Sequence, residues 1–321
     1  MHTPIKVAVI GTGYLGQFHA EKFAQLPQTE LIAVVDIDSI SANKVAKKCK
    51  TRAVTDYQQI LNQVDAVSIV TPTHTHYDIG KDCLEHGLHV LMEKPICNTI
   101  EQADTLIKLA NQKNRILQVG FLERFNPIVT ATADQIDNPM FIESTRIMPF
   151  NPRNKDINVV LDLMIHDIDL IQSMVKQPIQ SIDASGACVL TDRTDIANAR
   201  IHFANHCIAN VTASRISLKS ERKMRLFQGN AYFSLDFQDK QVSICTQGTG
   251  EMFPGIPNIK RKVVKAKKHD ALQDEIADFA DAILHNRPPL VTGEAGKTAL
   301  QTALKITEMV MSSPHYKAVT K

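Results

Sequence analysis

The chain contains 321 residues, of which 44% are hydrophobic and 22% are charged. This length suits about two domains, and the hydrophobic content excludes disorder as the dominant state. With 36 Lys and Arg against 34 Asp and Glu, the formal net charge is +2. That balance gives no electrostatic reason to expect a nucleic-acid-binding or membrane-surface protein.

The sequence shows no recognisable targeting or membrane segment. No stretch reaches the roughly 18 consecutive apolar residues of a membrane-spanning helix. Residues 1–6 lack the charged and apolar regions of a signal peptide. The 6 cysteines are spread without a C-x-x-C pair, which indicates reduced thiols rather than disulfides or a zinc site. We therefore expect a cytoplasmic protein without a metal.

Residues 1–120 alternate short apolar runs with helical stretches. Continuous apolar runs are typical of parallel strands covered on both faces. Strand–helix repeats of this kind predict a doubly wound parallel sheet with right-handed crossovers. The predicted strands are 5–10, 31–35, 66–70, 89–92 and 116–119, and the predicted helices are 15–26, 40–48, 76–86 and 100–111.

The pattern changes after residue 120 and predicts an α+β domain with an open antiparallel sheet. Apolar residues alternate with polar ones over several runs, as in strands with one covered face. The predicted domains are 1–122 and 123–321, and the last helices could pack back on the first domain. The predicted elements are strands at 141–147, 197–203, 207–213 and 231–237, helices at 159–175, 271–284 and 295–311, and a loop rich in Gly and Pro at 247–262.

A glycine-rich turn, Gly11-Thr12-Gly13-Tyr14-Leu15-Gly16, follows the first strand and opens the first helix. In a dinucleotide-binding turn, Gly11 would permit the tight turn, Gly13 the approach of a pyrophosphate, and Gly16 close packing. The helix N-terminus would offer its N–H groups to the phosphates. The alternative is a tight turn that binds no ligand.

An acidic residue, Asp36, ends the second strand about 20 residues after the glycine turn. A carboxylate at this place accepts hydrogen bonds from the ribose hydroxyls of NAD and repels the 2′-phosphate of NADP. Ile37, Asp38 and Ser39 follow, so no Arg is at hand to bind that phosphate. The sequence therefore favours NAD over NADP.

Polar residues follow two later strands and should line the same crevice, because ligands bind at the carboxyl ends of parallel strands. Thr71, Pro72, Thr73 and His76 follow one strand, and Glu93-Lys94-Pro95 follows the next. A lysine fixed at a strand end would point toward the nicotinamide. Taken alone, Glu93 and Lys94 could equally be an exposed charge pair.

Asp162 and His166 lie four residues apart on the long predicted helix, with Asp169 and Ser173 continuing the same face. An imidazole suits the removal of a hydroxyl proton near neutral pH. We therefore assign His166 as the base, Asp162 as the residue that orients it, and Lys94 as the cation that stabilises the developing alkoxide. Lys94 and His166 could exchange roles, and a structural Asp–His pair is the alternative.

As a set, these motifs resemble the Gfo/Idh/MocA family of glucose–fructose oxidoreductases and inositol dehydrogenases. The matching segments are 11–16, 71–76, 93–95 and Asp162-x-x-x-His166. The resemblance implies an N-terminal Rossmann domain, a C-terminal α+β domain, and NAD(P)-linked oxidation of a sugar or cyclitol hydroxyl. It also implies a homo-oligomer, dimeric or tetrameric, formed through the open sheet.

Within the family, residues 122–127, 156–169 and 211–217 are similar to a bacterial subgroup that oxidises C3 of UDP-N-acetylglucosamine for a partner aminotransferase in lipid A synthesis. Many members carry glycines around the aspartate, where this chain has Asn158, Val159 and Met164. The substrate-binding residues predicted on this basis are Arg124, Asn126, Arg146, Asp162, His166 and Arg215, with Arg153 and Lys219 as further phosphate binders.

Two other functions fit the same residues. One is a dehydrogenase of inositol or a free sugar from the same family. The other is a regulator that senses a sugar or NAD without turnover, although such a regulator would be free to lose Lys94, Asp162 and His166. Binding of a uridine nucleotide would separate the nucleotide-sugar enzyme from the free-sugar enzyme.

Overall fold

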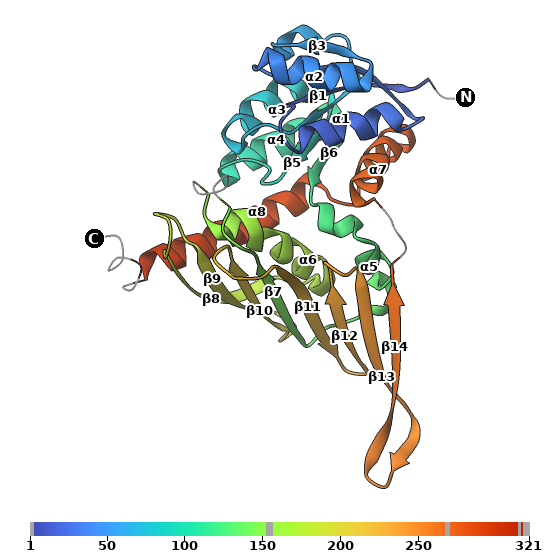
Figure 1. The fold of residues 1–321 in the computed structure, drawn as a ribbon, viewed down its shortest axis with the longest axis vertical. Helices are drawn as coiled ribbons and strands as arrows, with labels where there is room; N and C mark the ends of the chain where they lie inside the picture. Colours follow the sequence, from blue (N-terminus) through green and yellow to red (C-terminus); the bar gives the residue numbers. More distant parts are fainter. Residues whose placement is uncertain (1–2, 152–156, 267–269, 314–315, 317–321) are drawn as a thin grey trace. The chain divides into compact units, whose positions relative to one another are not determined.

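The computed structural model of the protein describes residues 3–151, 157–266, 270–313 and 316. The chain divides into two compact units (Figure 1). Unit 1 contains residues 1–125 and 270–300, and unit 2 contains residues 126–269 and 301–321. The chain thus leaves unit 1 after residue 125 and returns to it at residue 270.

Unit 1 is built on a parallel sheet of six strands in the order β3-β2-β1-β4-β5-β6. This is the predicted doubly wound sheet, and its strand order reverses between β1 and β4, where such sheets bind ligands. Of the strands in this sheet, the sequence analysis missed only the short β3. The strands are β1 (Ile5–Ile10), β2 (Thr29–Val35), β3 (Arg52–Val54), β4 (Ala66–Ile69), β5 (His89–Glu93) and β6 (Leu117–Gly120).

Helices cover both faces of this sheet. On one side α1 packs against α2 and α7, and on the other α3 packs against α4. Val7, Val9, Phe23, Ile276 and Phe279 belong to one buried core. The elements are α1 (Gly16–Gln25), α2 (Ser39–Cys49), α3 (His76–Glu85), α4 (Ile100–Lys113), α7 (Ala271–His285), the first part of α8 (Gly293–Ser312), η1 (Tyr57–Ile60), η2 (Thr73–Thr75) and η3 (Leu122–Phe125).

Unit 2 contains a sheet of eight strands in the order β14-β13-β12-β11-β7-β10-β9-β8. Its described pairs are antiparallel, as predicted, except that β7 and β10 run parallel. The strands are β7 (Phe141–Ile147), β8 (Ile179–Ala187), β9 (Ile196–Phe203), β10 (Ile208–Ser214), β11 (Glu221–Gln228), β12 (Ala231–Asp236), β13 (Gln241–Phe253) and β14 (Ile256–Lys265).

The alternation seen in the sequence puts one face of this sheet in the core. On β9, Ala197, Ala199, Ile201 and Phe203 are fully buried. Helix α6 (Ile165–Val175) packs on β7 and β10. It follows η6 (Val160–Met164), a π-helical turn, so the predicted long helix begins with a widened turn of a kind frequent at functional sites. The remaining elements are α5 (Pro127–Thr130) and η4 (Ala133–Gln135).

The predicted loop at 247–262 is wrong, because most of it forms the hairpin of β13 and β14. Its glycines and prolines lie in these two strands and in the tight turn that joins them. Gly255, with φ of +78°, makes the turn, and Gly250, with φ of +76°, lies at an irregularity in the register. Pro257 lies on β14, an edge strand, where a missing N–H is tolerated.

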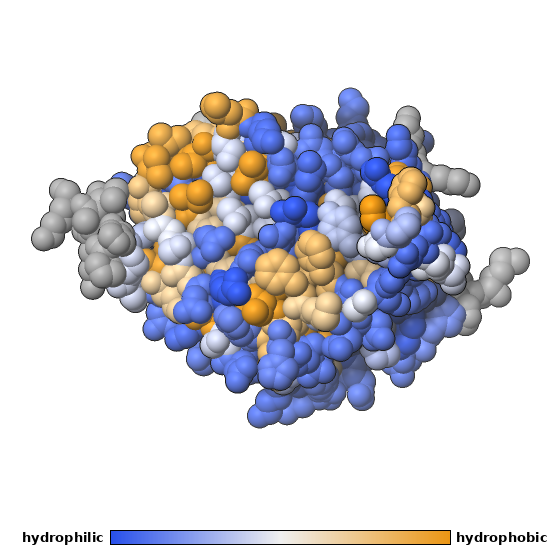
Figure 2. All heavy atoms as spheres, turned by 90° about the horizontal axis from the view of Figure 1, so that it is seen from below, coloured by the Kyte–Doolittle hydropathy of each residue, from blue (hydrophilic) through white to orange (hydrophobic). Residues whose placement is uncertain are grey.

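Part of this hairpin exposes large hydrophobic side chains. The residues are Met252, Phe253, Ile256, Ile259 and Val263. Figure 2 shows one face of the molecule, on which hydrophobic residues gather in patches between hydrophilic ones. None of the described helices is both long and apolar enough to span a membrane, and the 6 cysteines are free.

Candidate active site

The turn between β1 and α1 is shaped by three glycines, each for a different reason. Gly11 has φ of +95°, and a Cβ there would lie 2.4 Å from the carbonyl oxygen of Val70. A Cβ on Gly16 would lie 1.9 Å from the carbonyl oxygen of Gly11. Around the Cβ position of Gly13, no heavy atom of the described residues lies within 4 Å. The backbone at Gly13 is therefore open to a ligand, next to the N-terminus of α1.

Asp36, directly after β2, is fixed beside this turn. Its Oδ2 accepts hydrogen bonds from the backbone N and the hydroxyl of Thr12, at 2.7 and 2.9 Å, and its Oδ1 accepts from Asp38 N at 3.0 Å. Ser41 Oγ donates to the carbonyl oxygen of Thr12 at 3.1 Å. The carboxylate lies where the ribose hydroxyls of a dinucleotide bind in folds of this type.

Exposed apolar residues lie next to these polar groups along the chain. Ile37 and Ile40, on either side of the start of α2, are 95% and 80% exposed, and Tyr14 in the glycine turn is 67% exposed. The ring of Tyr14 meets the ring of Phe18 edge to face at 5.5 Å. Together the open turn, the fixed carboxylate and the apolar surface fit a dinucleotide with flat rings.

His76 connects the ends of two strands. Its Nδ1 lies 2.9 Å from the carbonyl oxygen of Pro95, and its Nε2 lies 2.8 Å from that of Thr71. The ring is buried, and burial lowers its pKa, although these carbonyl groups and Glu93 act in the opposite direction. His76 thus holds the turn after β4 against the turn after β5. Within the first turn, the Thr75 hydroxyl donates to Thr71 Oγ1 at 2.7 Å.

Glu93, the last residue of β5, is tied to α1 by a contact that the sequence analysis missed. His19 Nε2 donates to Glu93 Oε1 at 3.1 Å, and the backbone N–H of Lys94 donates to Glu93 Oε2 at 3.2 Å. Burial alone would raise the pKa of Glu93, but the hydrogen bond and charge of His19, with Lys94, outweigh it and lower that pKa. Glu93 therefore carries a negative charge directly beside Lys94.

The sequence does contain a signal for these buried titratable groups. On α1 and on α7, a titratable residue lies among the apolar residues of the buried face. On α1, the buried residues are Gly16, His19, Ala20 and Phe23. On α7, Glu275 falls in line with Ile276 and Phe279. Among the described residues, His19, Glu93 and Glu275 are the group of possible metal ligands, with one ligand atom of each within 4.8 Å of the others.

In unit 2, the predicted catalytic pair lies on the helix that begins with the π-helical turn. Asp162 belongs to η6, and His166 is the second residue of α6. The next residue, Asp167, is buried and accepts hydrogen bonds from Arg146 Nε at 2.8 Å and Arg146 Nη2 at 3.1 Å. Arg146, a predicted substrate-binding residue, is thus 4% exposed and holds α6 on β7.

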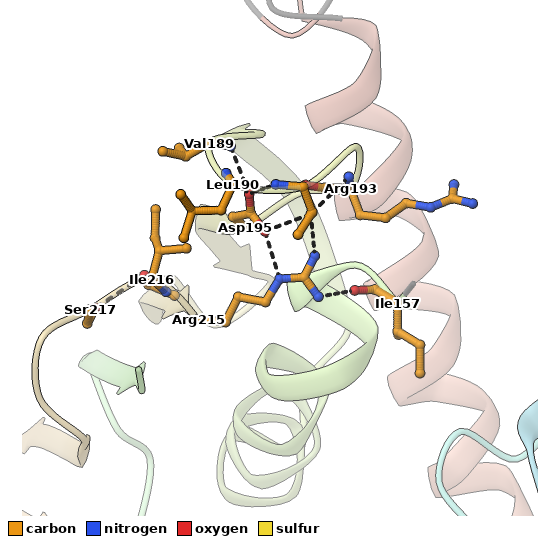
Figure 3. Close-up of polar contacts among 10 residues, drawn as sticks. Ile157, Val189, Leu190, Arg193, Asp195, Arg215, Ile216 and Ser217 are labelled. Atoms are coloured by element: carbon orange, nitrogen blue, oxygen red, sulfur yellow. Dashed lines mark hydrogen bonds and ion pairs between the residues drawn. The ribbon is translucent and has the colours of Figure 1, made fainter. Parts of the chain in front are cut away.

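Arg215, also predicted to bind substrate, is enclosed in a buried network (Figure 3). Its Nε donates to Asp195 Oδ1 at 2.8 Å, its Nη2 donates to the hydroxyl of Thr191 at 2.9 Å, and its Nη1 donates to the carbonyl oxygen of Ile157. These contacts fix the loop before β9 and the residues leading into η6. They give Arg215 a structural role that the sequence did not reveal.

Asp195 is the centre of that network. Its Oδ2 accepts from the backbone N–H groups of Val189, Leu190 and Thr191 at 2.7–3.0 Å. Burial alone would raise the pKa of this carboxyl, but the three N–H groups and Arg215 outweigh it and lower the pKa to about 2.

The remaining predicted residues lie in both units. Arg124 is half-buried on η3 in unit 1. Asn126 begins unit 2 and caps α5 through Oδ1, which accepts from Ile128 N at 3.3 Å. Lys219 is exposed and pairs with Glu221 at 2.9 Å. Arg153 lies outside the described residues.

Comparison with known proteins identifies relatives of both units. Residues 5–121 match the family model of Gfo/Idh/MocA oxidoreductases with an NAD-binding Rossmann fold, and residues 142–231 match the Gfo/Idh/MocA C-terminal domain. The chain is 38% identical over 303 residues to UDP-N-acetylglucosamine 3-dehydrogenase of Acidithiobacillus ferrooxidans, covering 94% of this chain and 96% of that protein. A solved structure of that enzyme has a TM-score of 0.91 at 37% identity, with 96% and 98% of the two chains covered.

More distant relatives share the fold with other substrates. The scyllo-inositol 2-dehydrogenase (NAD(+)) of Bacillus subtilis is 26% identical over 328 residues, covering 96% of this chain and 94% of that protein. Levoglucosan dehydrogenase, solved with NADH and levoglucosan, has a TM-score of 0.85 at 17% identity, with 96% and 97% of the two chains covered. At that identity the likeness concerns the fold alone.

Gly13→Ala should weaken NAD binding by at least about tenfold without lowering Tm. The added methyl meets no described atom within 4 Å, so it leaves the fold intact but fills the space for the diphosphate. Titration calorimetry with NAD and a thermal melt measure the two effects. Gly229→Ala in unit 2, also without a described neighbour within 4 Å, is the matched control and should change neither. Unchanged NAD binding in Gly13→Ala would contradict the assigned site.

Asp195→Asn should lower the free energy of unfolding by roughly 3 kcal/mol at neutral pH, because it leaves the Arg215 cation buried without its anion. The folded pKa of about 2 lies below the ordinary 3.8, so the stabilisation exists above 3.8 and is lost as pH falls toward 2. Urea denaturation from pH 7 downward should therefore show the two proteins converging in acid. Asp183→Asn, at an aspartate whose side chain is 79% exposed, should differ little from the wild type at any pH. Equal losses in both variants would refute the account.

Proposed function

Because the chain belongs to the Gfo/Idh/MocA oxidoreductase family, we propose that it is an NAD-dependent dehydrogenase that oxidises the C3 hydroxyl of UDP-N-acetylglucosamine to a ketone. The main support for this substrate is the 38% identity to a UDP-N-acetylglucosamine 3-dehydrogenase over 94% of the chain. Inositol oxidation is the second candidate, supported by the 26% identity to the B. subtilis enzyme over nearly the whole chain.

NAD fits the residues of unit 1. The glycine turn and the N-terminus of α1 would bind its diphosphate, and Asp36 would accept hydrogen bonds from its ribose. The same carboxylate disfavours the 2′-phosphate of NADP. Thr71, Pro72 and Thr73 lie at the next strand end and would bound the crevice. When bound, NAD supplies the acceptor for the hydride that leaves the sugar carbon.

The protein's own residues handle the proton and the charge. We assign His166 as the base that takes the hydroxyl proton, and Asp162 as the residue that orients its ring. Lys94 supplies a positive charge that stabilises the developing alkoxide. The backbone of Lys94 suits this role, because Glu93 accepts its N–H and His76 contacts the carbonyl group of Pro95, the next residue.

Arg124 is the arginine that we assign to the diphosphate of the nucleotide sugar. Its guanidinium could bind two phosphate oxygens at once. The guanidinium groups of Arg146 and Arg215 are engaged with Asp167 and Asp195, so we leave both arginines out of this assignment. A ketone at C3 of a sugar nucleotide is a substrate for amination, and we propose that the product goes to an aminotransferase in lipid A synthesis.

Purified protein with NAD and UDP-N-acetylglucosamine should produce NADH, followed by absorbance, when a carbonyl trap removes the ketone. Lys94→Ala and His166→Ala should each lower kcat by about 100-fold or more, because each removes a group that acts in the transition state. Lys108→Ala and His285→Ala, at exposed positions of α4 and α7, are the matched controls and should keep wild-type kcat.

The outcomes separate the candidates. Turnover of an inositol, with no thermal shift by a uridine nucleotide, would favour the second candidate. Wild-type kcat in His166→Ala at every pH would contradict its assignment as the base. A thermal shift with UDP-N-acetylglucosamine but no NADH would refute the proposed chemistry and favour a sensor.

We also propose that the protein is a homo-oligomer formed through the sheet of unit 2, whose β13–β14 hairpin exposes five large hydrophobic residues. Sedimentation equilibrium at micromolar concentration should give the mass of a dimer or tetramer. Phe253→Glu should increase the monomer fraction, because a charge on an apolar contact is costly to bury. A wild-type mass equal to that of one chain would contradict the proposal.

A further inference from the structure

Three titratable side chains from distant parts of the sequence meet inside unit 1. They are His19 on α1, Glu93 at the end of β5, and Glu275 on α7. His19 is 1% exposed and Glu275 is 0% exposed, while the side chain of Glu93 is 14% exposed. Gly120, opposite Glu93 on β6, makes room for this cluster, because a Cβ there would lie 3.0 Å from Glu93 Oε1.

Glu275 differs from the other two members in its hydrogen bonding. Neither of its carboxyl oxygens has a hydrogen-bond partner among the described residues, and the same holds for the nearby Gln118 Oε1. Gln118 Nε2 donates to the backbone carbonyl of Glu275 at 3.0 Å and not to its carboxyl group. A buried carboxylate without donors would be very costly.

The negative charges around Glu275 also favour its protonated form. Burial raises the pKa of Glu275, and the negative charges of Glu93 and of Asp278, one turn further along α7, raise it more. Asp278 is ion-paired with Arg287 at 2.7 Å. His19, the remaining titratable member, already donates to Glu93 through Nε2, and its Nδ1 lies within hydrogen-bond distance of Ser68 Oγ, at 2.9 Å.

A metal ion is the other occupant that such a cluster suggests, but the geometry favours a proton. The 3.1 Å between His19 Nε2 and Glu93 Oε1 is the length of a hydrogen bond. A metal would need the same nitrogen without its hydrogen. With Nε2 donating to Glu93, the imidazole has no free ligand atom on this side.

We propose that Glu275 is a positioning residue that stays a neutral carboxylic acid, so that Glu93 alone bears the negative charge that holds His19 and the backbone of Lys94. An ionised Glu275 would repel Glu93 across a gap of at most 4.8 Å in a dry interior. Glu93 would then turn away from His19 Nε2 and from the N–H of Lys94. The expected effect on turnover rests on the catalytic role proposed above for Lys94. The proton on Glu275 and the contact between Glu93 and the Lys94 N–H do not depend on that role.

The proton is tested by infrared spectroscopy of the full-length protein labelled with [13C]glutamate. The C=O stretch of a carboxylic acid is separate from that of a carboxylate. The wild type at neutral pH should show an acid band that Glu275→Gln removes and that Glu294→Gln, at an exposed glutamate of α8, leaves in place. Absence of that band, or a stoichiometric divalent metal in the purified protein by mass spectrometry, would overturn the proposal.

The positioning is tested on the same protein by hydrogen exchange of the Lys94 amide, measured by NMR. Glu275→Gln, which is neutral and of the same size, should leave this exchange as in the wild type at neutral pH. As the pH rises and Glu275 ionises, Lys94 exchange in the wild type should exceed that in Glu275→Gln at the same pH by about tenfold or more. In the turnover assay, Glu275→Gln should keep the wild-type kcat at neutral pH and should exceed it by about tenfold at alkaline pH, with the Kd for NAD within twofold.

The results separately test the proton on Glu275, its positioning role and the proposed function. Equal exchange of Lys94 in wild type and Glu275→Gln at every pH, or faster exchange in Glu275→Gln at neutral pH, would overturn the positioning role. If the wild type turned over no sugar, the proposed function would fail, and the infrared and exchange results would still decide the role of Glu275. If Glu275→Gln did not fold, the acid band and the pH dependence of Lys94 exchange in the wild type would carry the test.

Discussion

The organisation of unit 1 depends on how closely the chain passes itself after the first strand. Gly11 lies under the carbonyl group of Val70, and Gly16 lies against Gly11, at distances that no side chain permits. This close passage fixes the start of α1 at the carboxyl ends of the strands, where the strand order reverses between β1 and β4. It also sets the position of His19, one helical turn later, whose ring reaches Glu93 at the end of β5. The turn that opens the cofactor site therefore also holds the strand end that carries Lys94.

Buried charge is compensated in the same way in both units, with one exception. Asp167 pairs with Arg146, Asp195 pairs with Arg215, and Glu93 accepts hydrogen bonds from His19 and from the backbone of Lys94. Removing one partner of such a pair is far more costly than the pair itself is stabilising, so each fixes the elements that it joins. Glu275 has no cation of this kind among the described residues, and a bound proton replaces it. In the proposed arrangement, the interior of unit 1 thus contains one protonated carboxyl group, Glu275, close to the strand end that carries Lys94.

The sequence alone predicted the sheet of unit 1 and its cofactor turn, because glycine spacing and apolar runs are local signals. It failed at the hairpin of β13 and β14, where glycine and proline usually indicate a loop but here sit at a turn, an irregularity and an edge strand. The sequence predicted that Arg215 binds substrate, and it did not show that Asp195 lies against the Arg215 guanidinium. The His19–Glu93–Glu275 cluster was missed for the same reason: its members lie on three elements that only the fold brings together.

In the proposed reaction, hydride leaves C3 of the sugar ring. UDP-N-acetylglucosamine carrying deuterium at C3 tests it most directly, with the NADH formed from NAD analysed by mass spectrometry. We expect deuterium in the NADH and slower turnover than with the unlabelled sugar, because the C–H bond at C3 breaks in the reaction. NADH without deuterium, with the label retained in the sugar, would contradict it.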